Sequence, residues 1–204
     1  PAFNDLLGGQ TQAMFPGFEI HSITNGIHPF TWASPYLIHL YDKYLPGWAN
    51  EPELLVRVDL IPDNELQDAH AGAKAYLFQW IEETTGAKLD LDVLTIGFAR
   101  RATAYKRANM IFTDRDRLLK IGDGKLQLVF AGKAHPKDDY GKQMIQEICQ
   151  QEEFFGDKLK IVYLPNYNMD VASRLIPGVD IWLNNPLRPL EASGTSGMKA
   201  ALNG

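Results

Sequence analysis

Short apolar runs alternate with segments of helical character from about residue 91 to the end of this 204-residue chain. The expected strands are 93–96, 126–130, 160–164 and 179–183, and the expected helices between them cover roughly 103–120, 138–151 and 168–176. Strands that alternate with helices in this way predict βαβ units and a parallel sheet. We therefore expect an α/β fold, in which ligands bind beyond the carboxyl ends of the strands.

The part of the chain before residue 91 is predicted to be mainly helical. One helix is expected over 34–44, where Ser34 is the capping residue and Pro35 is the first helical position. A longer helix over 63–85 carries apolar residues at helical spacing. The predicted organisation is a crossing segment with little regular structure, a helical lead-in and an α/β domain, over residues 1–32, 33–90 and 91–204.

Composition excludes several classes of protein. Hydrophobic residues make up 45% of the chain and charged residues 22%, which is typical of a globular domain. The net charge of −5 argues against a general nucleic-acid or anionic-membrane surface. No apolar run reaches about 18 residues and no basic start precedes an apolar core, so we expect neither a membrane span nor a signal peptide. The one cysteine, Cys149, excludes an internal disulfide and indicates a reducing, cytoplasmic compartment.

The segment 191–199 has the residue types of an anion-binding turn. Small residues at 193–197 stand between Glu191 and Lys199. Small residues leave backbone N–H groups uncovered, and the positive end of a helix dipole attracts anions. We expect Thr195 to cap a helix here, which places Lys199 near that positive end. A protonated lysine is disfavoured there, so we expect its amine to be neutral or covalently used.

Other interpretations of this segment fail or stay open. The phosphate loop of nucleotide hydrolases requires Gly-Lys-Ser/Thr, whereas Met198 precedes Lys199 and Ala200 follows it. Ser196 and Lys199 have the Ser-x-x-Lys spacing of penicillin-recognising enzymes, but neither Ser-Asp-Asn nor Lys-Thr-Gly occurs in the chain. A tight Gly/Ser turn before an ordinary helix with an exposed lysine remains open on spacing alone.

Basic residues follow the first expected strand. Arg100, Arg101, Lys106 and Arg107 place four cations within eight residues, and we expect them to open the helix over 103–120. Cations are unfavourable at the N-terminal end of a helix, because the helix dipole is positive there. Their presence therefore indicates a role other than starting the helix. We therefore favour a site for a dianionic ligand over a solvated basic helix start.

Polar residues elsewhere are weaker signals. Tyr167 follows the third expected strand, where a buried tyrosine at a strand end is an equally ordinary interpretation. Asn25 and Gly26 predict a turn. His70 and His135 lack partners at metal-ligand spacing, so no metal site is expected.

The string Glu191-Ala-Ser-Gly-Thr-Ser-Gly-Met-Lys199, followed by Leu202-Asn-Gly, closely resembles the cofactor segment of the α-glucan (glycogen, starch and maltodextrin) phosphorylases. The resemblance extends from about residue 14 to residue 204 and includes the strings around Asn25, Lys106 and Tyr167. In that family the lysine at the position of Lys199 carries pyridoxal 5′-phosphate. The resemblance implies that the cofactor is contacted by Arg100, Tyr167, Gly194, Thr195, Ser196 and Gly197.

The resemblance also implies substrate contacts. Arg101 and Lys106 match the catalytic residues that hold the substrate phosphate beside the cofactor. The residues that match glucose-binding positions are Asn25, Glu191, Ser193 and Gly194. The chain departs from the family pattern where Phe30-Thr31 replaces an arginine pair, Thr103-Ala104 replaces His-Glu, and Pro165 and Asn168 replace Glu and Arg, so the contacts of those residues are not carried over.

For the whole chain, the resemblance implies the cofactor-bearing C-terminal domain of a GT-B glycosyltransferase, with an incomplete Rossmann-like parallel sheet. Because the chain starts at Pro1 and stops at Gly204, we expect a piece of a longer protein that is inactive alone and truncated at its C-terminal end. The parent is expected to be a homo-oligomer that transfers the terminal glucose of an α-1,4-glucan to orthophosphate, giving glucose 1-phosphate. The fourth strand is expected to form an exposed edge that favours association.

Two other functions stay open. A nucleotide-sugar-dependent retaining transferase, similar to a glucan synthase, shares the architecture but needs no lysine-bound cofactor. A non-catalytic glucan-binding module would keep the cleft and bind glucan without phosphorolysis.

Overall fold

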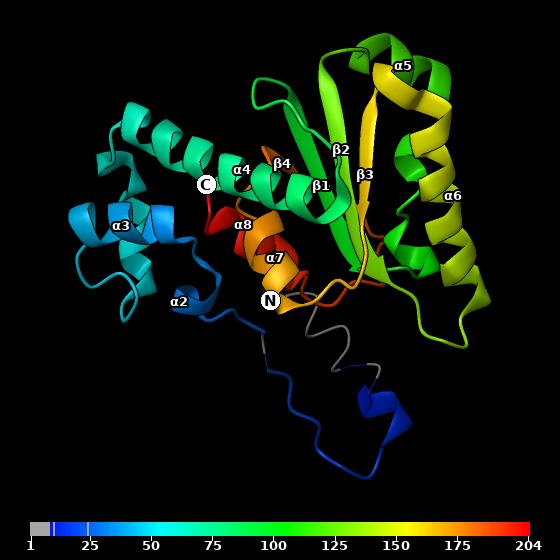
Figure 1. Ribbon diagram of the computed structural model, residues 1–204. Coiled ribbons are helices and arrows are strands. Elements are labelled where there is room, and N and C mark those ends of the chain that lie inside the picture. Colours follow the sequence, from blue (N-terminus) through cyan, green and yellow to red (C-terminus); the bar gives the residue numbers. More distant parts are fainter. Residues whose placement is uncertain (1–8, 10, 24) are drawn as a thin grey trace.

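The computed structural model describes residues 9, 11–23 and 25–204, and in this part of the chain a four-stranded parallel sheet has helices on both faces (Figure 1). The strands are β1 (Leu94–Arg101), β2 (Leu126–Lys133), β3 (Lys160–Leu164) and β4 (Ile181–Trp182). The α-helices are α2 (Pro29–Trp32), α3 (Pro35–Tyr44), α4 (Asp63–Thr85), α5 (Arg115–Gly122), α6 (Asp139–Phe155), α7 (Met169–Leu175) and α8 (Thr195–Ala201). The 3-10 helices are η1 (Pro52–Leu60), η2 (Ala104–Lys106), η3 (Met110–Phe112) and η4 (Gly156–Lys158).

The strand order is β3-β2-β1-β4, so the chain crosses from one side of β1 to the other between β3 and β4. β1 and β2 pair along their whole lengths, from Leu94↔Leu126 to Arg101↔Lys133. β4 pairs with β1 only through Ile181 and Trp182. The α/β, Rossmann-like fold expected from the sequence is therefore confirmed, and the carboxyl ends of β1, β2 and β3 meet at one edge of the sheet.

Alternate residues of the strands pack into two separate hydrophobic cores. In β2, Leu128 and Phe130 belong to the core beneath α5 and α6, whereas Val129 and Ala131 belong to the core beneath α4 and α7. Figure 1 shows these two pairs of helices on opposite sides of the sheet. A strand that is buried on both faces reads as a continuous apolar run, which is why the strands could be recognised from the sequence.

The helices before the sheet form a third core with the end of the chain. Ser34 caps α3 by accepting a hydrogen bond from the Leu37 N–H (3.3 Å), as predicted, and Pro35 is the first residue of that helix. Trp48 is 1% exposed and lies in this core together with Leu202, which follows α8. The first half of α4 contacts this core and its second half contacts the sheet.

An ionic cluster joins α4 to the amino ends of β1 and β4. The Asp180 carboxylate is 2.8 Å from Lys74 Nζ and 2.8 Å from His70 Nε2, and it accepts a hydrogen bond of 2.7 Å from the Thr95 N–H. Lys74 is buried, and its Nζ also donates to the Val93 carbonyl (3.0 Å). His70 therefore has a carboxylate as its partner in the fold.

Two predictions about helix starts were wrong. No helix runs over 103–120: η2 ends at Lys106 and is followed by Arg107, which has a left-handed backbone (φ 52°). α5 starts only at Arg115, and its cap Asp114 accepts a hydrogen bond from the Arg117 N–H (2.9 Å). Thr195 does not cap α8, because it is the first helical residue and Gly194 is the cap. The short helices α2 and η1 were not expected. Within the described residues, no helix combines the length and the apolar character that a membrane span requires.

Candidate active site

A cavity of about 380 Å³ lies at the carboxyl edge of the sheet. It brings together the end of β1, η2, the turn between β3 and α7, and the segment that leads into α8. Of the site residues predicted from the sequence, it is lined by Asn25, Arg100, Arg101, Lys106, Tyr167, Glu191, Ser193, Gly194, Thr195, Ser196 and Lys199. Gly197 does not line the cavity but belongs to the first turn of α8 beside it. The structure therefore gathers the candidates around one hollow.

Two buried cations share one carboxylate at the base of this cavity. Arg100 is 8% exposed and Lys106 is 6% exposed. Arg100 Nη2 donates to Glu191 Oε1 (2.9 Å), and Lys106 Nζ donates to Glu191 Oε2. With the exposed Arg101 at the end of β1, three cations face one carboxylate, so the cavity suits an anionic ligand.

None of these three cations lies at the start of an α-helix. Arg100 and Arg101 are the last two residues of β1, and Lys106 ends η2. The prediction that the basic segment opens a helix was wrong, so the helix dipole does not oppose these charges. Their burial and their shared carboxylate are the reasons to assign them to a site.

Lys199 lies in the last turn of α8 and is partly buried. Burial lowers the pKa of its amine, because a charged amine is poorly solvated there. Its Nζ lies 3.2 Å from the centroid of the Trp32 ring. A lysine with a lowered pKa is more often neutral, and only the neutral amine is a nucleophile. The expectation of an exposed lysine after an ordinary turn does not describe this residue.

In the turn before Lys199, small residues allow another group to come close to the backbone. Gly194 has a left-handed backbone (φ 61°), which glycine adopts without strain. A Cβ at Gly197 would lie 3.3 Å from the side-chain nitrogen of Asn184. The Ser196 hydroxyl is buried and has no hydrogen-bond partner among the described residues. A buried hydroxyl without a partner costs free energy unless a ligand supplies one.

Tyr167 enters the cavity between the end of β3 and the start of α7. Burial raises the pKa of its phenol, and the positive charge of Arg100 lowers it by less. Asn168 caps α7 by accepting a hydrogen bond from the Val171 N–H (3.0 Å), which fixes the chain directly after Tyr167. The phenol therefore keeps its proton at neutral pH and can donate a hydrogen bond into the cavity.

Sequence reasoning missed three contributors to the site. Trp32 contacts the Lys199 amine, Asn184 accepts a hydrogen bond from Arg100 Nη1, and Tyr105 lies with its ring centroid 4.6 Å from Lys106 Nζ. Tyr105 stands beside Lys106 in the basic string, which was a usable signal. Trp32 and Asn184 are brought in by chain crossings that no local pattern shows.

Two polar residues at and after the end of β2 lie outside the site. Lys133 is exposed at the end of β2 and does not line the cavity, and neither does His135. Across the residues that the structure describes, no group of three or more His, Cys, Asp or Glu side chains could hold a metal ion.

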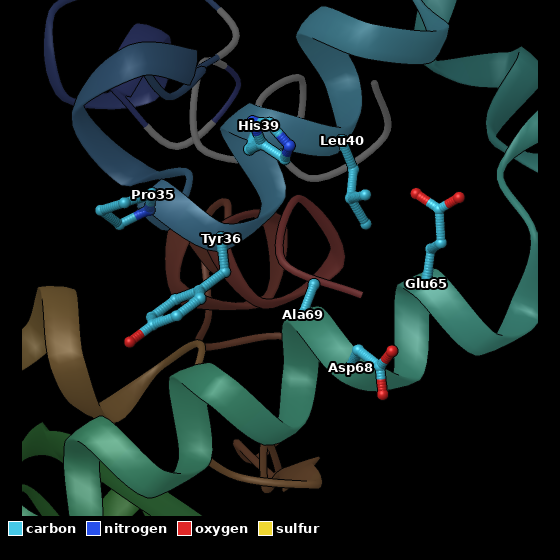
Figure 2. Close-up of a pocket in the computed structure, with 7 residues that line it drawn as sticks. All are labelled: Pro35, Tyr36, His39, Leu40, Glu65, Asp68 and Ala69. Atoms are coloured by element: carbon cyan, nitrogen blue, oxygen red, sulfur yellow. The ribbon is translucent and has the colours of Figure 1, made fainter.

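A second hollow, of about 430 Å³, lies between α3 and α4 (Figure 2). Its walls are Tyr36, His39, Glu65 and Asp68, over a floor that includes Leu40 and Ala69. It is lined by no lysine or arginine. Two carboxylates repel phosphate, so this hollow does not compete with the cavity at the sheet edge as an anion site.

Comparison with known proteins agrees with this geometry. The family model described as carbohydrate phosphorylase matches residues 10–204. The chain is 41% identical to the maltodextrin phosphorylase of Thermococcus litoralis and 43% identical to the glycogen phosphorylase of Aquifex aeolicus, in each case over 91% of its own length. It is 39% identical to the glycogen phosphorylase of Mycobacterium tuberculosis over 99% of its length.

The parallel sheet with helices on both faces, and the cationic cavity at its carboxyl edge, define an α/β domain of Rossmann-like architecture. More narrowly, the chain belongs to the carbohydrate phosphorylase family. It spans 24%, 30% and 26% of the lengths of these three relatives, in the order given above.

Proposed function

We propose that this chain is the cofactor-bearing part of an α-glucan phosphorylase, which transfers the terminal glucose of an α-1,4-glucan to orthophosphate and releases glucose 1-phosphate. The observation that carries the proposal is the cavity in which Lys199, with its lowered pKa, shares a wall with Arg100, Arg101 and Lys106. An enzyme that consumes phosphate needs a cationic pocket to bind the anion. It also needs a site that excludes water from the reacting groups.

The residues of this cavity fit pyridoxal 5′-phosphate. Lys199 offers a partly buried amine for its aldehyde, the unpartnered Ser196 hydroxyl offers a hydrogen bond, and Tyr167 offers an aromatic wall. Gly194 and Thr195 complete the turn, whose N–H groups would hold the 5′-phosphate with help from Arg100. The Gly197 N–H donates to the Gly194 carbonyl (2.9 Å), so Gly197 would serve by its lack of a side chain. When bound, the cofactor supplies a phosphate group that exchanges a proton with the substrate phosphate.

The chain's own residues then have separable tasks. Arg101 and Lys106 bind the substrate phosphate and offset its repulsion from a second phosphate nearby. Asn25, Ser193 and the Gly194 backbone bind glucose hydroxyls from the cavity wall. Glu191 accepts from a sugar hydroxyl while it keeps Arg100 and Lys106, because a carboxylate has about four lone-pair sites.

Three broader features belong to the same proposal. The substrates are an α-1,4-glucan and orthophosphate, the full-length protein is a homo-oligomer, and it acts in the cytoplasm. Residues 1–32 cross between domains, residues 33–90 form the helical lead-in, and residues 91–204 belong to the α/β domain.

Borohydride reduction of the full-length protein, followed by peptide mass mapping, tests the cofactor. We expect a pyridoxyl-phosphate mass on Lys199 and none on Lys133, the exposed lysine outside the cavity. An unmodified Lys199, with no pyridoxal released on denaturation and none taken up on addition, would contradict the proposal and favour a nucleotide-sugar transferase.

A substitution separates phosphate binding from cofactor binding. Lys106→Met removes a cation from the substrate phosphate, and we expect kcat/KM for phosphorolysis to fall by about 10²–10³ while Lys199 still becomes labelled. The measurement is release of glucose 1-phosphate from maltooligosaccharides at varied phosphate. Glucan binding without any phosphorolysis in the unsubstituted protein would instead support a non-catalytic module.

A further inference from the structure

Asn203 is buried where three helices begin or end. Its side chain makes three hydrogen bonds of 2.7 Å: Nδ2 donates to the Trp32 and Lys199 carbonyls, and Oδ1 accepts from the Ser34 N–H. Trp32 is the last residue of α2, Ser34 is the cap of α3, and Lys199 lies in the last turn of α8. Backbone groups at helix ends lack partners within their own helix. One amide therefore satisfies three helix ends at once.

These bonds tie together two residues whose side chains contact each other, and one of the two, Lys199, lines the cavity. The Trp32 ring and the Lys199 amine are in contact, although their chain segments are far apart in sequence. Asn203 bonds the main chain of both residues, so it fixes the backbone positions from which the indole and the lysine side chain extend. Asn203 is 4% exposed; its bond from the Ser34 N–H is buried and its two bonds to carbonyl groups are partly buried, so water competes little for them.

We propose that Asn203 is a positioning residue for Lys199, because it holds the indole of Trp32 against the amine and thereby sets the burial and reactivity of that amine. The inference rests on the proposed function, in which Lys199 is the cofactor lysine. An asparagine suits this task because one short side chain supplies two donors and an acceptor. An ionised aspartate supplies no donor, and a leucine supplies neither donor nor acceptor.

The other charged and titratable groups around Lys199 come from the sheet edge and from the turn before α8. Those that line the same cavity are Arg100, Arg101, Tyr105, Lys106, Tyr167 and Glu191. None of them bonds Asn203. A substitution at Asn203 leaves these groups in place, so a change in the titration of Lys199 reports on the position of Lys199 itself.

Trace acetylation tests the proposal without cofactor or turnover. The full-length protein, freed of pyridoxal phosphate, is treated with trace acetic anhydride at a series of pH values, and peptide mass mapping gives the rate at Lys199. Asn203→Leu removes all three bonds at similar volume. The amine then becomes less buried and its pKa rises, so we expect labelling at pH 8 to become about threefold slower.

Two further variants distinguish a specific effect on Lys199 from a general loss of folding. Asn203→Asp keeps the bond from the Ser34 N–H and loses both donations, and we expect slower labelling of Lys199 here as well. Tyr41→Phe removes another bond between α3 and the end of α8, from Tyr41 Oη to the Leu202 carbonyl (2.8 Å), and should leave the labelling unchanged. Lys133 serves as the reference rate in every sample.

Unchanged labelling of Lys199 in both Asn203 variants would overturn the proposal. Equal slowing in Tyr41→Phe would overturn it too, because the effect would then follow general loosening of α8. The outcome is independent of the cofactor assignment, since the reagent reads only the amine. A Lys199 that responds to Asn203 but takes up no pyridoxal would contradict the proposed function and leave this inference standing.

Discussion

At the scale of single residues, Glu191 balances two cations that would otherwise be costly to bury. Arg100 and Lys106 are both almost inaccessible, and both bond the Glu191 carboxylate. Removing one partner of a buried ion pair leaves an uncompensated charge. The carboxylate therefore has a structural task in addition to the sugar contact proposed for it.

Glu191→Gln separates these tasks. The variant leaves Arg100 and Lys106 without a counter-ion, and we expect the free energy of unfolding to fall by about 2–4 kcal/mol in a buffer without phosphate. Added orthophosphate supplies the missing negative charge, so it should raise the thermal midpoint of the variant more than that of the unsubstituted protein. An equal response of both proteins to phosphate would show that the anion does not reach these cations.

Asp180 gives the fold a defined response to acid. Burial raises the pKa of its carboxyl group, but the hydrogen bonds from Lys74, His70 and the Thr95 N–H outweigh burial and hold the pKa below its ordinary value of 3.8. A lowered pKa in the folded state means that the stabilisation is complete above the ordinary value and is lost as the pH falls through the folded value. The cluster therefore contributes at neutral pH and fails in acid.

Asp180→Asn tests this cluster. We expect a loss of about 2–3 kcal/mol at pH 7, because Lys74 stays buried without its counter-ion, and a flatter decline of stability below about pH 4. Urea unfolding at several pH values measures both. Lys43→Met breaks the exposed pair with Glu65 and should change the midpoint little. A steep acid decline that persists in Asp180→Asn would assign that decline to other carboxyl groups.

At the scale of elements, a helix or strand could be predicted from the sequence when its own residues carry the apolar pattern. β2, β3, β4 and helices α3, α4, α6 and α7 were predicted close to their observed positions, because each carries its own apolar pattern. The first strand was predicted only over 93–96, whereas β1 continues to Arg101. The segment 103–114 was not predicted correctly, since its left-handed Arg107 and its capping Asp114 break a helix that composition alone favoured. The cavity residues at strand ends could be predicted from the rule for parallel sheets, whereas Trp32 depends on a tertiary crossing.

Gly132 shows how closely β1 and β2 approach at the cavity. A Cβ at this position would lie 2.3 Å from the Arg100 carbonyl oxygen, so the strand ends must separate to admit one. We expect Gly132→Ala to cost about 1–3 kcal/mol of stability and to weaken phosphate binding, because Arg100 and Arg101 would shift with the backbone. Gly17→Ala, where nothing lies within 4 Å, is the matched control. Unfolding curves and the KM for phosphate are the measurements, and a Gly132→Ala protein that behaves like Gly17→Ala would refute the argument.

At the scale of the whole molecule, β4 lies at an edge of the sheet, as predicted, and is only two residues long. A short edge strand offers few unpaired backbone groups. Association through this edge stays a prediction, as does the division of the chain at residues 32 and 90. α4 packs into the core that it shares with α3 and also into the core that it shares with α7 and the sheet. The helical lead-in is therefore not a layer separate from the α/β domain.

That dual packing has a consequence for how the molecule comes apart. α4 is 23 residues and therefore about 35 Å long, and it contributes Ala69 to one core and Leu77, Phe78 and Ile81 to another. Neither core can lose its order without removing support from the same helix. Two separate hydrophobic clusters are in this way made into one cooperative unit, and the middle of α4 becomes the region whose amide protons exchange only when both clusters unfold.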